Sequence, residues 1–214
     1  MLLPSTYYHI YNHANGDDNL FREERNYPFF LEKYHYYIDQ ITDTIAWCLM
    51  PNHFHLLVRI KDVEDLVKTF PKFGTLEKFG EGATLENLSG SEKEKQLSFL
   101  LSKQFSNLFS SYTQAFNKVY QRKGSLFLKN FKRKAIHNDA YLQRLILYIH
   151  LNPVKHGFTT EITGWLHSSY SEFWEKQTAL ASQLFGDKDQ VEKIHFEKQS
   201  YFKEYTAIEN HLLT

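Results

Sequence analysis

Two histidines one residue apart, His53 and His55, lie within the stretch MPNHFHLLV at residues 50–58. The side chains of a β-strand alternate between two faces, so both imidazoles point to the same side. Two imidazoles side by side could hold one divalent cation. Alternatively, they could be edge histidines whose nitrogens are satisfied by neighbouring groups. The pair alone leaves both interpretations open.

A second group of candidate residues lies in AYLQRLILYIHLNPVKHG, residues 140–157. On a helix, Tyr148 and Asn152 are four residues apart and therefore neighbours on one face. The amide oxygen of Asn152 suits Mg²⁺ or Mn²⁺, and the phenol of Tyr148 is a nucleophile when a metal or base assists it. In the alternative, Tyr148 packs beside Leu145 and Asn152 only caps the helix before Pro153.

Positive charge is concentrated between Lys118 and Lys134, a stretch without any acidic residue. Three aromatic residues, Tyr120, Phe127 and Phe131, are interleaved with the cations. This combination suits a surface that follows a phosphate backbone and stacks bases, although a solvated turn would have a similar composition. The candidate nucleic-acid contacts are Arg122, Lys123, Lys129, Lys132, Arg133 and Lys134.

The periodicity of apolar residues predicts the elements that position these groups. The first half contains a strand at 7–13, a helix from 26 to about 44, strands at 45–49 and 52–60, and a short helix near 63. The second half contains a long amphipathic helix from 92 to about 119, a strand or strand pair over 125–136, and a helix from 140 to about 152. Asn138 caps this last helix and Pro153 ends it. The order β-α-β-β-α-β predicts an α+β fold, a ferredoxin-like (RRM-like) antiparallel sheet backed by helices. Residues 61–91 are interpreted as an insertion and residues 176–214 as a helical C-terminal extension.

The composition excludes several classes of protein. With 214 residues and 42% hydrophobic residues, the chain can form one packed domain and is not a disordered protein. Lys plus Arg and Asp plus Glu both number 25, so the net charge indicates no partner. A single cysteine, Cys48, excludes an intrachain disulfide and a Cys-rich zinc finger. The absence of a signal peptide and of a long apolar run predicts a cytoplasmic protein without a membrane partner.

The motifs also resemble those of a known family. MPNHFHLLV resembles the HUH motif (His, hydrophobic, His) of single-tyrosine transposases, and YIHLNPVKHG resembles the segment that bears the nucleophile in REP-associated tyrosine transposases and their IS-type relatives. YYHIYNHANGDDNLFREERNYPFFLE and SYTQAFNKVYQRKGSLFLKNFKRKAI are similar to two further landmarks of that family. The resemblance runs from about residue 6 to residue 174, and the joint order of the motifs is more specific than any one of them.

This resemblance implies a function and roles for the site residues. His53 and His55 are expected to be metal ligands on a middle strand, Asn152 the third ligand, and Tyr148 the nucleophile on a neighbouring helix. The family cleaves and rejoins single-stranded or hairpin DNA through a 5′-phosphotyrosine with Mg²⁺ or Mn²⁺, which implies a catalytic domain over about 1–175. Whether the chain acts as a monomer or a homodimer stays open.

Some positions depart from the family pattern, and two other functions remain as alternatives. His13-Ala14-Asn15 lacks the usual Arg of its turn, and Leu128 and Asn130 replace the common Gln and Arg of the strand motif. One alternative is a non-catalytic nucleic-acid-binding protein on the same scaffold, against which the intact His53, His55 and Tyr148 argue. The other is an H-x-H metallohydrolase with a water nucleophile, which would require further acidic or His ligands.

Overall fold

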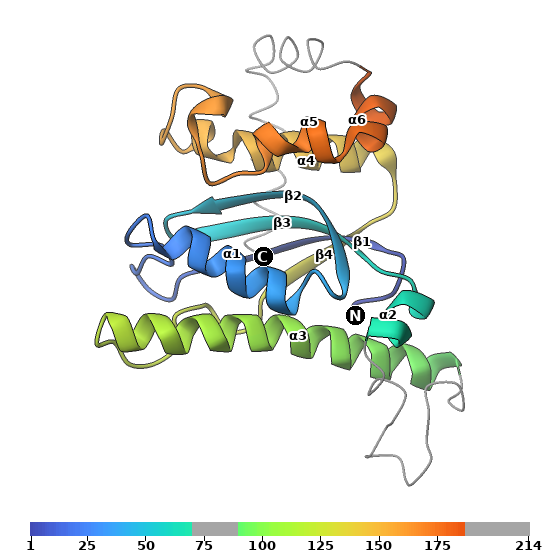
Figure 1. The fold of residues 1–214 in the computed structure, drawn as a ribbon, viewed down its shortest axis with the longest axis horizontal. Coiled ribbons are helices and arrows are strands. Elements are labelled where there is room, and N and C mark those ends of the chain that lie inside the picture. The colour runs from blue at the N-terminus through green and yellow to red at the C-terminus, as the bar shows by residue number, and fades with distance from the viewer. Residues whose placement is uncertain (70–89, 187–214) are drawn as a thin grey trace, which may run out of the picture.

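Four antiparallel strands form one sheet in the order β2-β3-β1-β4 (Figure 1). The computed structural model describes residues 1–69 and 90–186. The strands are β1 (Tyr7–His13), β2 (Thr42–Met50), β3 (His53–Ile60) and β4 (Lys132–Ile136). The chain order and the antiparallel pairing confirm the predicted α+β class, with a sheet backed by helices.

Helices cover both faces of the sheet (Figure 1). They are α1 (Asn26–Tyr37), α2 (Val63–Thr69), α3 (Gly90–Val119), α4 (Asp139–Lys155), the 3-10 turn η4 (Ile162–Gly164), α5 (Tyr170–Lys176) and α6 (Thr178–Phe185). Helices α1 and α3 lie on one face, and α4 lies on the other with α5 and α6 (Figure 1). Within the described ranges, no helix is long and apolar enough to cross a membrane.

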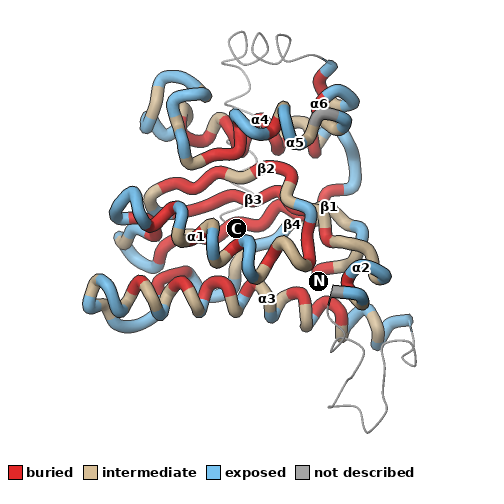
Figure 2. Tube along the Cα trace, in the orientation of Figure 1, coloured by how far each residue is buried: buried red, intermediate tan, exposed pale blue. Residues whose placement is uncertain are grey.

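The side chains of β3 alternate strictly between the two faces of the sheet. Phe54, Leu56 and Val58 point into the core beneath α1 and α3, where the ring of Phe54 lies 5.5 Å from that of Phe30. Leu57, between them, belongs to the second core, which packs under α4. Figure 2 shows the strands buried between the two helical layers. The same alternation puts His53 and His55 on the α4 side.

The first helix is shorter than its apolar spacing predicts. We expected it to reach about Thr44, but α1 ends at Tyr37 and β2 begins at Thr42. Ile38 and Ile41 are fully buried in the turn between them, so their spacing reflects the core and not a continued helix. From Thr42 on, the chain pairs with β3, beginning opposite Ile60. The β-branched Thr42 and Thr44 favour this extended conformation.

The predicted strand or strand pair over 125–136 is also shorter than expected. Only β4 is a strand, and Phe127 makes an isolated bridge with Ala14. Between them, Asn130 adopts a left-handed backbone conformation with φ of 64°. Such a residue cannot continue a strand, and asparagine is among the residues that tolerate it best.

The described part of the predicted C-terminal extension packs on the domain. Ala181 and Phe185 of α6 are buried in the same core as Leu145 of α4, and Gln143 donates to the carbonyl of Leu184 at 2.7 Å. The sequence did not indicate α5. The short helix predicted near Val63 is confirmed as α2, whereas residues 70–89 and 187–214 lie outside the described residues. The insertion at 61–91 and the division at 175 stay predictions.

The aromatic core between α1 and the sheet provides a test of the fold. Phe30 is fully buried, and its ring lies 5.2 Å from that of Tyr112 on α3. We expect Phe30→Ala to lower the free energy of unfolding by about 3–5 kcal/mol in urea titrations, because the removed ring leaves a cavity. On the same helix, Tyr36 is 65% exposed, and Tyr36→Ala should change it by less than about 0.5 kcal/mol. Equal losses would show that α1 is not packed as described.

Candidate active site

The predicted histidines and the tyrosine converge between β3 and α4. The ring centroids of His55 and Tyr148 are 5.2 Å apart, and those of His53 and His55 are 5.1 Å apart. All three side chains are buried, and Tyr148 is only 1% exposed. They line a cavity of about 590 Å³ together with His13 and His156. Strand β3 lies between β2 and β1, so the two histidines are not on a sheet edge.

Asn152 completes this group, one helical turn after Tyr148. Its Nδ2 donates to the carbonyl of Tyr148 at 3.3 Å, and its Oδ1 lies 3.4 Å from Nε2 of His53. Nδ1 of His53 is 2.7 Å from Oδ1 of Asn52, an acceptor, so this ring nitrogen carries the proton. A lone pair on Nε2 of His53 therefore faces the carbonyl-type oxygen of Asn152. A cation between these two atoms could accept a lone pair from each of them.

Burial keeps the imidazoles of His53 and His55 in the neutral form. Burial, with a smaller contribution from His13, lowers the pKa of His53 to about 3. Burial and the neighbouring His9 likewise hold the pKa of His55 well below its ordinary value. Neutral imidazole is the form that ligates metals. Across residues 1–69 and 90–186, no three His, Cys, Asp or Glu side chains cluster as a metal site, so two imidazoles and one amide make up the candidate ligand set.

The sequence reasoning missed His9, a third buried histidine. It lies on β1 and is fully buried, and its Nε2 is 3.0 Å from Nδ1 of His55. Burial lowers the pKa of His9 to about 3, and its Nδ1 has no hydrogen-bond partner among the residues that the structure describes. The alternation of Tyr7–His13 puts His9 on one face of its strand, but only the pairing of β1 with β3 shows that this is the face of His55.

Pro153 does not end α4, contrary to the prediction from sequence. Proline removes only one backbone donor, and the helix continues to Lys155. This last turn matters to the site. The Nζ of Lys155 lies 5.8 Å from the ring centroid of Tyr148, and the ring of His156 lies 5.4 Å from that of His53. The cap predicted at the start of the helix is confirmed, because Asn138 accepts from the backbone N–H of Tyr141.

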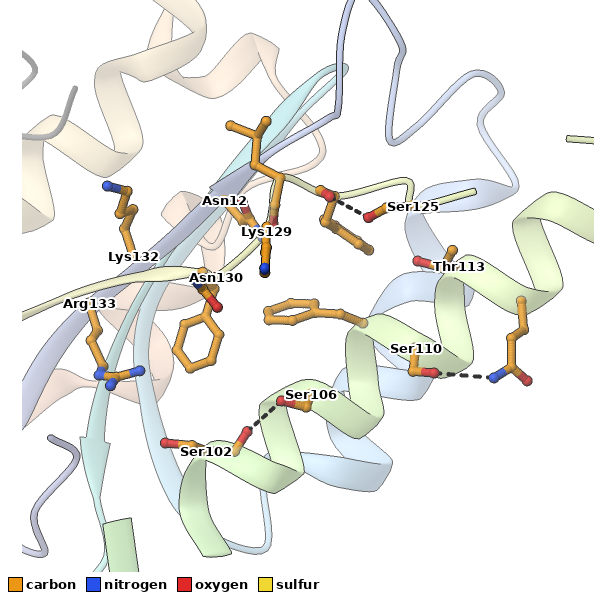
Figure 3. Close-up of a pocket in the computed structure, with 15 residues that line it drawn as sticks. Asn12, Ser102, Ser106, Ser110, Thr113, Ser125, Lys129, Asn130, Lys132 and Arg133 are labelled. Atoms are coloured by element: carbon orange, nitrogen blue, oxygen red, sulfur yellow. Dashed lines mark hydrogen bonds between the residues drawn. The ribbon is translucent and has the colours of Figure 1, made fainter. Parts of the chain in front are cut away.

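The alternation of β4 divides the predicted nucleic-acid contacts between the two faces of the sheet. Lys132 pairs with Tyr11 and Lys134 with His9, so both lysines lie on the face of the histidines. Arg133 between them lies on the opposite face, towards α3, as Figure 3 shows. The structure thus brings two of these cations to the tyrosine side of the sheet.

The remaining predicted contacts lie in the loop before β4. Lys123 and Lys129 are exposed. Arg122 differs from them, because its guanidinium pairs with Asp18 and donates to the carbonyl of Ser125 at 2.9 Å. Arg122 therefore organises the loop, and its contact with DNA stays a prediction.

Comparisons with known proteins agree with the resemblance seen in the motifs. The chain is 25% identical over 130 residues to a putative REP-associated tyrosine transposase of Haemophilus influenzae, an alignment that covers 60% of this chain and 58% of that relative. Its fold is similar to that of a solved REP-associated tyrosine transposase bound to a REP hairpin, with a TM-score of 0.52, 18% identity and 82% of each chain covered. No family model matches the chain.

The buried histidines predict a loss of stability in acid. The pKa values of His9, His53 and His55 lie below the ordinary 6.5, so below pH 6.5 the unfolded chain binds protons that the folded chain does not. The free energy of unfolding should therefore fall between pH 6.5 and 5, by up to about 1.4 kcal/mol per pH unit for each imidazole. Urea titrations at several pH values measure this slope.

One substitution isolates the contribution of His9 to this slope. His9→Gln should make the pH dependence shallower by about one proton. If His9→Gln keeps the full slope, then His9 is protonated in the folded protein and the neutral site is wrong.

Proposed function

We propose that this chain is a single-tyrosine transposase-type nuclease that cleaves and rejoins single-stranded DNA with the help of a divalent metal ion. The observation that carries this proposal is that Tyr148, His53 and His55 line one cavity, with Oδ1 of Asn152 3.4 Å from Nε2 of His53. The sequence likeness to a REP-associated tyrosine transposase supports it independently.

His53, His55 and Asn152 would hold Mg²⁺ or Mn²⁺. When bound, the ion would withdraw charge from the phosphorus of the scissile phosphodiester. The protein residues would orient the reactants around it. The hydrogen bond from Nδ2 of Asn152 to the Tyr148 carbonyl fixes the amide, so its oxygen faces His53 and not the solvent.

Tyr148 would be the nucleophile. Its phenolic oxygen forms a bond to phosphorus and loses its proton, while the bond from phosphorus to the 3′-oxygen breaks and that oxygen leaves as a free 3′-OH. The product is a 5′-phosphotyrosine, and attack by another 3′-OH reverses the step without any external energy source. The ammonium group of Lys155 lies over the ring of Tyr148, 5.8 Å from its centroid.

The proposed partner is single-stranded or hairpin DNA. The solved protein with a similar fold is described as bound to a REP hairpin. In this chain, Lys132 and Lys134 lie on the tyrosine side of the sheet, and Lys129 lines the active-site cavity with Lys132. These cations would contact phosphates on the strand that enters the cavity.

Substitution of the tyrosine gives the most direct test. We expect Tyr148→Phe to abolish the covalent protein–DNA adduct, which denaturing gels detect after incubation with a labelled hairpin oligonucleotide and Mn²⁺, and to leave DNA binding within about twofold, because only the reacting oxygen is removed. His53→Ala should abolish metal-dependent cleavage.

Tyr141→Phe is the matched control on the same helix. It removes a buried hydroxyl that has no hydrogen-bond partner within residues 1–69 and 90–186, and it should keep full adduct formation. Cleavage by Tyr148→Phe with free 5′-phosphate products would instead favour a metallohydrolase with a water nucleophile. Binding without cleavage by the wild type would favour the non-catalytic alternative.

His9 would position His55 for the metal. A metal-bound histidine usually donates its other ring N–H to a second residue, and Nδ1 of His55 faces Nε2 of His9 at 3.0 Å. We expect His9→Leu to weaken Mn²⁺ binding by about 10- to 100-fold in calorimetric titrations. His9→Gln should retain more of the affinity, since the amide oxygen can accept the same hydrogen bond. Equal affinities of all three proteins would refute this role.

A further inference from the structure

A second cavity, of about 850 Å³, lies beside the active site between α3 and the segment 128–133 (Figure 3). We call it the α3 groove. Among the residues that line it, the α3 wall carries hydroxyl and amide groups, and the opposite wall carries cations. None of the lining residues is acidic.

The α3 wall is unusual for an exposed helix surface. Ser102, Ser106, Ser110 and Thr113 follow one another at helical spacing and face the groove (Figure 3). From residue 96 to residue 117, the helix contains a single charged residue and no acidic one. Small hydroxyl groups donate to phosphate oxygens, and a wall without carboxylates does not repel a polyanion.

The opposite wall combines positive charge with an aromatic surface. Lys129 and Arg133 lie on this side of the groove (Figure 3). The ring centroids of Phe131 and Phe105 on α3 are 5.2 Å apart. The guanidinium carbon of Arg133 lies 5.4 Å from the ring centroid of Phe131. Cations next to an anchored ring are the elements by which proteins hold single-stranded nucleic acid without reading its sequence.

The α3 groove and the active-site cavity share one wall. Asn12, Leu128, Lys129, Asn130 and Lys132 line both. Asn12 holds this wall in place by donating to the carbonyl of Leu128 at 3.2 Å. A strand lying in the groove therefore has to cross only the segment 128–132 to reach Tyr148.

We propose that the α3 groove holds the single-stranded DNA flank that leads into the active site. The inference rests on the proposed function for its choice of DNA as the ligand. In it, the hydroxyl groups of α3 and the side chains of Lys129 and Arg133 contact successive phosphates, and Phe131 forms the floor. Contacts of this kind are sequence-independent and weaken with salt.

A pair of matched double variants tests the groove. Ser106→Glu with Ser110→Glu puts two carboxylates into the groove, whereas Asn107→Glu with Ser111→Glu puts them on the same helix, at the same spacing, outside the lining residues. Fluorescence anisotropy with a labelled 20-nucleotide oligothymidylate measures binding, in a Tyr148→Phe background so that no cleavage occurs. We expect the groove pair to bind at least tenfold more weakly and the control pair less than twofold more weakly.

The dependence of binding on salt gives a second measurement. Arg133→Gln should reduce the slope of log K against log salt concentration by roughly 0.7, the value for one lost contact to a single strand. Lys118→Gln, an exposed change on α3 outside the groove lining, should leave the slope unchanged. Thermal unfolding of each variant confirms that it is folded.

The groove and the proposed chemistry fail in different ways. Equal binding by the two double variants, with an unchanged salt slope for Arg133→Gln, would overturn the groove whether or not Tyr148 forms an adduct. Loss of binding by the groove pair alone would support the groove, even if the wild type formed no adduct and the proposed chemistry failed.

Discussion

The antiparallel pairing of β1 with β3 is the constraint on which the site depends. It sets His9 on the face of His55 and His13 directly opposite His53, and it aims this whole face at α4. Strand side chains alternate with a period of two, so a slip of one residue would turn both histidines of β3 into the aromatic core and bring Phe54 under Tyr148. The aromatic packing of Phe54 with Phe30 and Phe109 on the other face holds this register. The core beneath α1 and α3 thus fixes a site on the opposite side of the sheet.

Burial gives the site its electrostatic character. Imidazoles sealed between a sheet and a helix lose the solvation that a charged form needs, so they stay neutral and keep a lone pair for a ligand. Removing water also strengthens any interaction between a cation and those lone pairs. The same burial destabilises the folded protein in acid, because the unfolded chain binds protons that the buried imidazoles do not bind. Asn152 avoids this cost because its amide does not titrate, and it can face a cation at any pH.

Particular residues show how far the sequence could go. The motif around His53 and His55, the helix of Tyr148 and Asn152, and the order of the elements were all predictable, since they depend on local spacing. The long-range consequences were not. His9 joins the site only through strand pairing, and Lys155 reaches Tyr148 only because one proline removes too little to stop α4. The left-handed backbone at Asn130 similarly shortened the strand or strand pair that the sequence predicts over 125–136.

The segment 128–134 lies between the α3 groove and the active-site cavity. The left-handed backbone at Asn130 separates the loop from β4. The side chains of β4 then alternate, so Lys132 and Lys134 lie on the tyrosine side of the sheet and Arg133 lies on the side of α3. A chain with no net charge thereby presents cations on both sides of a thin wall, between the groove and the catalytic cavity. The positioning of the strand and the chemistry on it would then depend on the same seven residues.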